Sequence, residues 1–219
     1  MNLGEDMGTN IRDLITEWPK CFIKDTDLEM LLGKTDEARY SLVKRALKKG
    51  LLIRIKRGLY LIAGKNKKSL PDEFEMALTI YGPSFVSLES ALSYHGWIPE
   101  IVYTTTCVST KRAKEFETPI GIFSYRRVPT KKFYTGVERI EINKGVIFVA
   151  TPWRALADFI YTRRKSWENL SELEADLRID RETILSSDLK ILVLLIESYP
   201  SRRVRETLKK ISKEILNKS

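Results

Sequence analysis

The segment 36–63 constrains the fold more than any other part of the chain, because a helical pattern gives way there to two short strand patterns. Apolar residues recur at helical spacing through 36–49. Thr35 can cap the N-terminus of this helix, and Gly50 can end it in a left-handed conformation. The runs LLIRI and LYLIA then predict two strands. Because Gly58 lies between them and accepts the positive φ of a tight turn, the two strands are expected to form a hairpin.

The residues before this segment predict two further helices. Residues 9–18 have an amphipathic helical pattern, and Phe22 and Ile23 predict a brief extended segment. Asp25 can cap a second helix that ends at Gly33. The inward side chains of this second helix are expected to be Leu28, Leu31 and Leu32. A helix, a helix-turn-helix and a two-stranded hairpin, in this order, predict a winged helix-turn-helix domain.

The positive charge of the chain is concentrated in the same region. The formal net charge of the 219 residues is +9. The stretch Arg39–Pro71 contains eleven Lys and Arg residues and no Asp or Glu, so the rest of the chain carries −2. A basic stretch with strong local structure is the usual electrostatic signature of nucleic-acid binding. On charge alone, a solvated lysine-rich face explains the stretch equally well.

The helix over 36–49 is expected to enter the major groove of double-stranded DNA. One arc of this helix is apolar and should pack on the first two helices. That arc contains Ala38, Leu42, Val43, Ala46 and Leu47. Side chains of the opposite arc and of the first turn can reach base edges or phosphates. The helix residues predicted to bind DNA are Arg39, Tyr40, Ser41, Lys44, Arg45 and Lys48. Among them, Arg39 lies nearest the apolar arc.

The predicted hairpin supplies the other DNA contacts. Arg54, Lys56 and Arg57 would place its tip against the DNA backbone or the adjacent minor groove. A winged helix that only docks another protein is the alternative interpretation of the same domain. Residues 65–71 (KNKKSLP) have the composition of a basic linker.

After Pro71 the pattern becomes mixed α and β. Helices are expected at 72–82, after Ser87, after Thr151-Pro152, and at about 169–177, 187–199 and 201–216. Strands are expected at 101–109, 121–128, 137–142 and 146–150, with Asn143-Lys144-Gly145 as the last hairpin loop. The predicted fold class is α+β, in three parts: a winged helix-turn-helix domain (1–64), a basic linker (65–71) and a mixed α/β C-terminal domain (72–219).

Motifs for small-molecule chemistry are absent from the sequence. GxGxxG, HExxH and GxSxG do not occur, and two cysteines with one histidine are too few for a common structural zinc site. We therefore expect no catalytic residue, no metal and no cofactor. His95, the only histidine, is expected to be packed or hydrogen bonded at a helix end. Asp158 lies in an apolar helix and is expected to pair with a basic residue or a backbone N–H.

Two other basic groups have more than one interpretation. Basic and aromatic residues alternate over 123–134; they are Arg126, Arg127, Lys131 and Lys132 with Phe123, Tyr125, Phe133 and Tyr134. Such alternation can stack single-stranded nucleic acid, but strand alternation that places the aromatics in the core is favoured. The final helix has an apolar stripe of Val204, Leu208, Ile211 and Ile215. Docking on the domain core is its expected role, with a protein- or DNA-binding surface as the alternative.

Three segments together resemble a known family. They are KRALKKGLLIRIKRGLYLI (44–62), FVSLESALSYHGWIPE (85–100) and ATPWRALADFIY (150–161). In this order they look like the AbiEi-type antitoxins of type IV toxin–antitoxin systems, over roughly Asp13 to Pro200. The chain departs from the family pattern at Trp153, where an acidic or basic residue usually stands.

The resemblance implies a DNA-binding autorepressor that is also an antitoxin in phage defence by abortive infection. Its N-terminal domain would bind double-stranded DNA at its own promoter, in repeated half-sites, and its C-terminal domain would be needed for antitoxicity. A nucleotidyltransferase-like toxin would be the functional partner, without a stable complex. The alternative is an enzyme that modifies nucleic acids or nucleotides, targeted by the winged helix. The acidic, small N-terminus MNLGEDMGTN predicts no signal peptide, so a cytoplasmic protein that does not contact membranes is expected.

Overall fold

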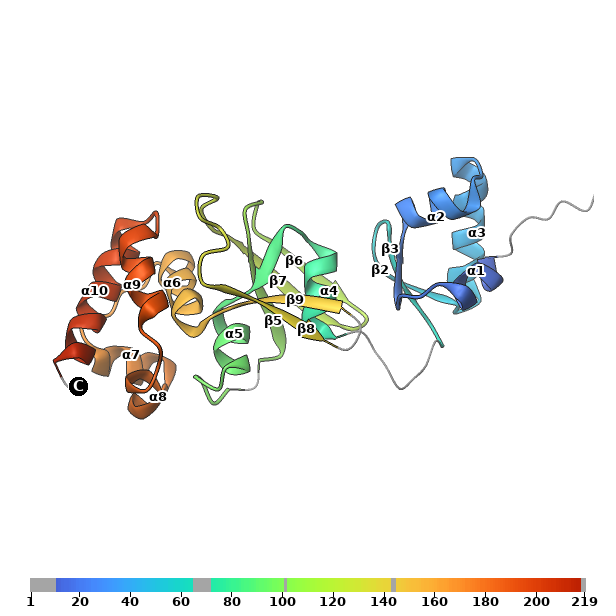
Figure 1. Ribbon diagram of the computed structural model, residues 1–219. Coiled ribbons are helices and arrows are strands. Elements are labelled where there is room, and N and C mark those ends of the chain that lie inside the picture. The colour runs from blue at the N-terminus through green and yellow to red at the C-terminus, as the bar shows by residue number, and fades with distance from the viewer. Residues whose placement is uncertain (1–10, 65–71, 101, 143–144, 218–219) are drawn as a thin grey trace, which may run out of the picture. The chain divides into compact units, whose positions relative to one another are not determined.

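The structure is a computed structural model that describes residues 11–64, 72–100, 102–142 and 145–217. The chain divides into two compact units (Figure 1). The N-terminal unit is Met1–Asp72 with Thr118–Ile120, and the C-terminal unit is the remainder. The predicted linker, 65–71, lies outside the described residues. Both units mix helices and strands, so the protein is an α+β protein.

The N-terminal unit contains the elements that the sequence predicts. In chain order they are α1 (Ile11–Glu17), β1 (Phe22–Lys24), α2 (Asp25–Leu32), α3 (Asp36–Lys48), β2 (Leu52–Lys56) and β3 (Leu59–Ile62). The strands form an antiparallel sheet of order β1-β3-β2. The brief extended segment predicted at Phe22 and Ile23 is therefore the third strand of this sheet.

The ends of α3 follow the predicted caps, whereas the start of α2 does not. The Thr35 side chain accepts a hydrogen bond from the Ala38 N–H at 3.4 Å, and Gly50 has a φ of +65° after the last turn. Asp25 was expected to cap α2, but it lies inside the first turn of that helix. The cap is formed instead by Asp27, whose carboxylate accepts the Lys24 N–H at 2.9 Å.

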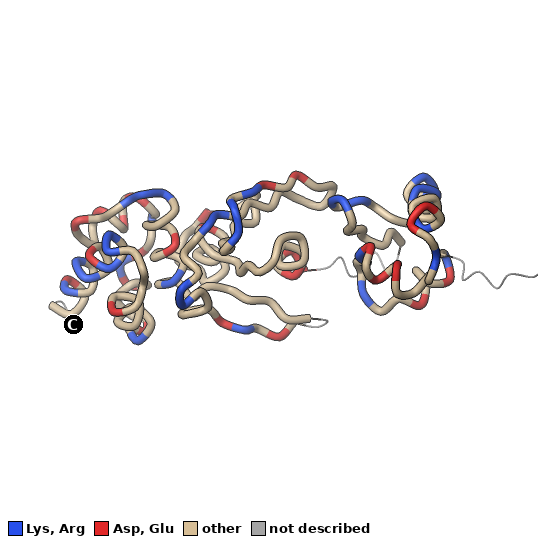
Figure 2. The backbone as a smooth tube through the Cα atoms, turned by 90° about the horizontal axis from the view of Figure 1, so that it is seen from above, with Lys and Arg blue, Asp and Glu red and all other residues tan. Residues whose placement is uncertain are grey.

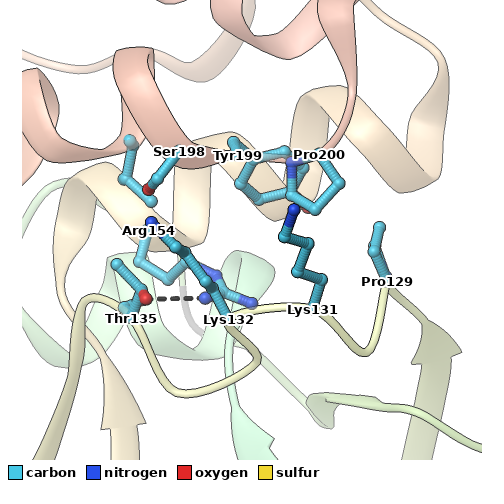
Figure 3. Close-up of a pocket in the computed structure, with 9 residues that line it drawn as sticks. Pro129, Lys131, Lys132, Thr135, Arg154, Ser198, Tyr199 and Pro200 are labelled. Atoms are coloured by element: carbon cyan, nitrogen blue, oxygen red, sulfur yellow. Dashed lines mark hydrogen bonds between the residues drawn. The ribbon is translucent and has the colours of Figure 1, made fainter.

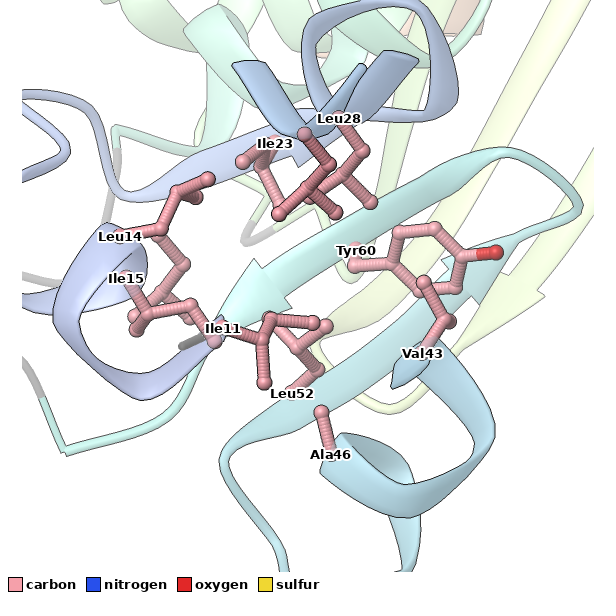
Figure 4. Close-up of a cluster of buried hydrophobic side chains, with 11 residues drawn as sticks. Ile11, Leu14, Ile15, Ile23, Leu28, Val43, Ala46, Leu52 and Tyr60 are labelled. Atoms are coloured by element: carbon pink, nitrogen blue, oxygen red, sulfur yellow. The ribbon is translucent and has the colours of Figure 1, made fainter. Parts of the chain in front are cut away.

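The core of the N-terminal unit lies between the three helices and one face of the sheet (Figure 4). Its buried members are Ile11, Leu14, Ile15, Ile23, Leu28, Leu32, Val43, Ala46, Leu52, Tyr60 and Ile62. The expected burial of Leu31 is wrong, since this side chain is 40 % exposed. Leu28 and Leu32 are one helical turn apart and face the core, so Leu31 lies at the edge of their arc.

The C-terminal unit is built on a six-stranded mixed sheet of order β6-β7-β5-β4-β9-β8. The strands are β4 (Ser84–Val86), β5 (Thr104–Ser109), β6 (Lys114–Thr118), β7 (Gly121–Arg127), β8 (Val137–Ile142) and β9 (Gly145–Ala150). β4 is antiparallel to β5 and parallel to β9, while β5 and β7 are parallel. β8 and β9 pair antiparallel, as the predicted hairpin requires. Asn143 and Lys144 of its loop lie outside the described residues.

The helices of this unit are α4 (Glu73–Ile80), α5 (Leu88–Tyr94), α6 (Pro152–Arg163), α7 (Leu170–Leu177), α8 (Arg181–Leu185), α9 (Lys190–Ser198) and α10 (Arg202–Leu216). α6 to α10 form a helical group at the C-terminal end of the chain (Figure 1). The predicted apolar stripe of α10 is fully buried, and the helix packs on α9 and α6. Its predicted docking role is confirmed.

Three short elements of the C-terminal unit were not predicted. β4 has only three residues, yet it is an interior strand of the sheet and is buried throughout. β6 is an edge strand with exposed charged residues, and α8 is a helix of five residues. Elements this short carry too few residues for a periodic pattern to identify them.

Candidate nucleic-acid interface

The outer face of α3 presents the polar arc that the sequence predicts. Val43 and Ala46 are buried against the core, which fixes the rotation of the helix about its axis. Five predicted contact residues are consequently exposed, namely Tyr40, Ser41, Lys44, Arg45 and Lys48. Leu42 and Leu47 are only partly buried at the margin of the apolar arc. Figure 2 marks the Lys and Arg residues of the unit in blue and the Asp and Glu residues in red.

Arg39 is engaged within its own helix. Its guanidinium forms an ion pair with Asp36 at 2.5 Å and donates to the Lys34 carbonyl at 2.7 Å. The Arg39 side chain is 18 % exposed, whereas the Asp36 side chain is 92 % exposed. The Asp36 carboxylate therefore competes with any other anion for the Arg39 guanidinium.

The β2–β3 hairpin is attached to the start of α2. Gly58 turns the chain with a φ of +76°, and its carbonyl accepts the Asp25 N–H at 3.1 Å. A Cβ atom at Gly58 would lie 3.0 Å from Asp25 Oδ2, so the carboxylate packs directly on the turn. Arg54 is exposed on β2, and Arg57 is exposed in the turn itself. The position of these two arginines relative to α2 and α3 therefore depends on Asp25.

Tyr60 connects the hairpin, Asp25 and the core. Its residue is 5 % exposed, and it lies opposite Arg54 in the strand register. Burial raises the pKa of the Tyr60 hydroxyl, and the Asp25 carboxylate raises that pKa further by its charge and by a hydrogen bond. The Arg54 charge opposes this shift. The hydroxyl is thus held in its neutral, hydrogen-bonded form.

A groove of about 530 Å³ lies between α2, α3 and the hairpin. Its walls are formed by Asp25, Leu28, Asp36, Arg39, Tyr40, Val43, Arg54, Arg57 and Tyr60. The groove brings together four of the nine predicted contact residues, which come from a helix and a hairpin. Ser41, Lys44, Arg45, Lys48 and Lys56 do not line it. Three arginines against two carboxylates give the groove a modest positive charge, which favours an anion.

The acidic residues of this groove were missing from the predicted site. The sequence predicted Asp25 only as a helix cap and assigned Asp36 no role in the site. The spacing of Asp36 and Arg39, three residues apart on one helix, was a signal that could have revealed their ion pair. The contact of Asp25 with the hairpin joins residues far apart in the sequence, so no local pattern indicates it.

A buried polar cluster lies in the C-terminal unit around Asp158. This residue is 0 % exposed, and both of its carboxylate oxygens accept from Arg154 Nε, at 3.0 and 3.1 Å. The hydroxyls of Ser87 and Tyr199 each donate to the carboxylate at 2.9 Å. Burial raises the pKa of Asp158, and the Arg154 charge and the two hydroxyl donors oppose that shift. The predicted pairing of Asp158 with a basic residue is confirmed.

Ser87 and His95, at the two ends of α5, both bond to the region of α6. Ser87 occupies the N-cap position, but its hydroxyl donates to Asp158 and makes no cap hydrogen bond. A serine at the start of a predicted helix is expected to cap it with its side chain, and Ser87 does not do so. His95 is the C-cap residue, and its Nε2 lies 2.9 Å from the Ala150 carbonyl oxygen. The expected hydrogen bond of a helix-end histidine is confirmed.

The alternating basic and aromatic segment is mostly part of the core. Phe123, Tyr125 and Phe133 are buried, as the favoured interpretation predicts, whereas Tyr134 is 53 % exposed. The four basic residues of the segment are all exposed. An array of aromatic side chains open to stacking is therefore not present in these residues.

The described residues contain neither a cluster of metal ligands nor a helix that could span a membrane. Among them, no group of three or more His, Cys, Asp or Glu side chains could hold a metal ion. Within the same part of the chain, no helix has both the length and the apolar character to cross a lipid bilayer. Comparison of the chain with models of known protein families found no match, and comparison with curated proteins found none either. The resemblance to AbiEi-type antitoxins therefore stays a prediction.

Proposed function

We propose that the protein is a sequence-specific DNA-binding repressor of its own promoter and the antitoxin of a type IV toxin–antitoxin system. The observation that carries the DNA-binding part is the juxtaposition of α3 and the β2–β3 hairpin around one groove. Basic side chains from both elements are exposed there or beside it.

The order of elements supports a winged helix-turn-helix as the DNA-binding domain. α2 and α3 would be the helix-turn-helix, α3 the reading helix, and β2–β3 the wing. In such a domain the reading helix lies in the major groove, and cations of the wing contact the backbone or the minor groove. Lys44 and Lys48 would then face bases or phosphates, and Arg57 would contact the phosphate backbone beside them.

The antitoxin part of the proposal rests on the resemblance of three sequence segments. Two of them, 85–100 and 150–161, meet in the C-terminal unit, because Ser87 bonds to Asp158 and His95 bonds to Ala150. The segments therefore belong to one packed structure, as expected if they define a family of C-terminal domains. The toxin would be a nucleotidyltransferase-like protein encoded beside this chain.

The DNA-binding part is tested by titrating the protein against the promoter upstream of its own gene. Lys44→Ala and Arg57→Ala should each weaken binding and reduce the slope of log affinity against log salt by about 0.9, the loss of one phosphate contact. Lys213→Ala is the matched control, because Lys213 is an exposed lysine of α10 in the other unit. An unchanged slope in both variants would contradict the assignment of α3 and the hairpin to DNA.

The antitoxin part is tested by co-expression with the adjacent nucleotidyltransferase-like gene product. The protein should restore growth of cells that express this toxin, and should do so without co-purifying with it. Absence of any such reading frame next to the gene, or failure to restore growth, would contradict this part and leave the DNA-binding part intact.

A further inference from the structure

A second positively charged site lies in the C-terminal unit, remote in sequence from the proposed DNA-binding residues. It is a cavity of about 10 Å³, bounded by the loop before β8, by α6 and by the end of α9 (Figure 3). Arg154, Lys131 and Lys132 are the basic residues of its wall. The volume admits one group of the size of a water molecule.

Arg154 forms the inner wall of the cavity and keeps part of its hydrogen-bonding capacity unused. Its side chain is 4 % exposed. Nε donates to Asp158, and one Nη group donates to the Thr135 carbonyl at 2.6 Å. Phe85 and Tyr199 lie against the guanidinium, with ring centroids 4.9 and 5.6 Å away. The other nitrogen, Nη2, has no acceptor among the described residues, although an arginine has five N–H donors to satisfy.

Lys131 and Lys132 form the mouth of the same cavity. Both residues are exposed, and neither ammonium group has an ion-pair partner among the residues that the structure describes. Figure 3 shows both side chains beside Arg154 and below the segment Ser198–Pro200. Since Asp158 balances Arg154, these two lysines leave a local charge of +2 at the mouth.

The backbone at the mouth is held in an uncommon conformation. Lys132 has a φ of +55°, in the left-handed region that residues other than glycine rarely adopt. A turn fixes it, in which the Thr135 N–H donates to the Lys132 carbonyl at 3.1 Å. Strained backbone of this kind concentrates at ligand-binding positions. A glycine at position 132 would adopt this conformation without strain, yet the position is occupied by a lysine at the mouth of the cavity.

We propose that this cavity binds a terminal phosphate group. One phosphate oxygen occupies the cavity and accepts from Arg154 Nη2, and the remaining oxygens lie at the mouth between Lys131 and Lys132. A terminal phosphate carries nearly two negative charges at neutral pH, which matches the charge of the mouth. An internal phosphodiester carries only one charge and has ester substituents on two sides, so it fits a site with a single narrow entrance less well.

The phosphate can belong to a mononucleotide or to the 5′ end of a nucleic acid, since both present the same group. Adenosine 5′-monophosphate and a short oligonucleotide with a 5′-phosphate distinguish these sources. A mononucleotide site binds the monophosphate more tightly than inorganic phosphate and gains nothing from further nucleotides. A site for nucleic-acid ends binds the 5′-phosphorylated oligonucleotide most tightly and loses affinity when its 5′ end is a hydroxyl.

The experiment is a calorimetric titration of the full-length protein with inorganic phosphate, at an ionic strength held constant with sodium chloride. Saturable binding of one phosphate per chain is expected. Lys131→Gln/Lys132→Gln should weaken it at least tenfold. The matched control is Lys209→Gln/Lys213→Gln, which removes the same charge from exposed positions of α10 and should change affinity less than twofold.

Two further measurements localise the bound phosphate. The Nε–H resonance of Arg154, protected by Asp158, should shift on addition of phosphate. The variant Lys44→Ala/Arg57→Ala should bind phosphate as the wild type does, because its substitutions lie in the N-terminal unit. Absence of saturable binding, equal loss in the two Lys→Gln pairs, or an unmoved Arg154 resonance would each overturn the proposal and leave a cavity that holds only water.

Discussion

Replacement of Asp36 by Asn should strengthen the DNA binding proposed above, an unusual direction for a substitution at a binding surface. The Asp36 carboxylate lines the groove between α3 and the hairpin and holds the Arg39 guanidinium at 2.5 Å. Asn keeps the size and shape of the side chain but removes its charge. Arg39 is then released for a phosphate, and a negative charge is removed from the path of the DNA backbone.

The size of the effect follows from the number of cations. α3 and the hairpin expose five of them, Lys44, Arg45, Lys48, Arg54 and Arg57. With one phosphate per cation, the slope of log affinity against log salt is about −4.5, and a released Arg39 makes it about −5.4. A carboxylate about 7 Å from a phosphate in water repels it by about 0.6 kcal/mol, so its removal alone gives about a threefold gain in affinity.

Fluorescence anisotropy with labelled promoter DNA between about 50 and 200 mM salt measures both quantities. The matched control is Glu37→Gln, which removes an equal charge from the same helical turn, because Glu37 does not line the groove. Stability should change little, since exposed ion pairs contribute about 0.2–1 kcal/mol. If Asp36→Asn binds no more tightly than Glu37→Gln, or its slope is that of the wild type, then Arg39 is not restrained by Asp36 in the way described.

Two further predictions concern thiol reactivity and the hairpin turn. Burial raises the pKa of the Cys107 thiol, so the native protein should react with Ellman's reagent at pH 8 only through the partly exposed Cys21. Both thiols should react after denaturation, and rapid reaction of two thiols in the native protein would contradict the burial of Cys107. Gly58→Ala should destabilise the N-terminal unit more than Gly33→Ala. Both glycines have positive φ, so alanine at either position costs about 1–2 kcal/mol in backbone strain. Only at Gly58 does the added Cβ atom also meet the Asp25 carboxylate. Hydrogen exchange of the β3 amides measures the difference, and equal protection in the two variants would show that the Asp25 contact contributes nothing.

The secondary structure of the N-terminal unit was predictable because local rules decide it. The apolar arc of α3 is set by helical spacing, and its ends are set by Thr35 and Gly50, which act within a few residues of themselves. The sequence therefore predicted the rotation of α3 about its axis correctly, and so predicted which of its side chains are exposed. The error at Leu31 is also local, since the arc of a short helix is narrower than the run of leucines suggested.

The site itself was predictable only in part, because it depends on contacts between distant segments. A helical wheel places Arg39 on the helix but does not include the carboxylate that binds it. Asp25 has the composition and position of a cap, yet it packs against a turn more than thirty residues later in the chain. In both cases local rules place the residue in its helix but do not identify the group that it contacts in the folded protein.

In the buried cluster of the C-terminal unit, contacts between distant segments again replace the role that local sequence suggests. Ser87 has a good capping residue type at a helix start, but its hydroxyl donates to the buried Asp158 carboxylate, and Thr106 Oγ1 accepts the Ser90 N–H of the helix end instead. Ser87, Arg154, Asp158 and Tyr199 come from three separate segments, so only the folded chain brings them together. Sequence analysis could identify Asp158 as a carboxylate in need of a partner, without identifying the partners.

This cluster also determines how the antitoxin proposal can be tested. Substitution of Arg154 or Asp158 would leave a buried charge without its partner, which costs about 3–5 kcal/mol and unfolds many domains. Loss of antitoxicity in such a variant would report on folding, even though these residues lie in a segment that resembles the family. Lys131 and Lys132 are exposed and border the same cluster. Substitution of these two lysines therefore separates a role of the C-terminal surface in antitoxicity from the stability of the unit beneath it.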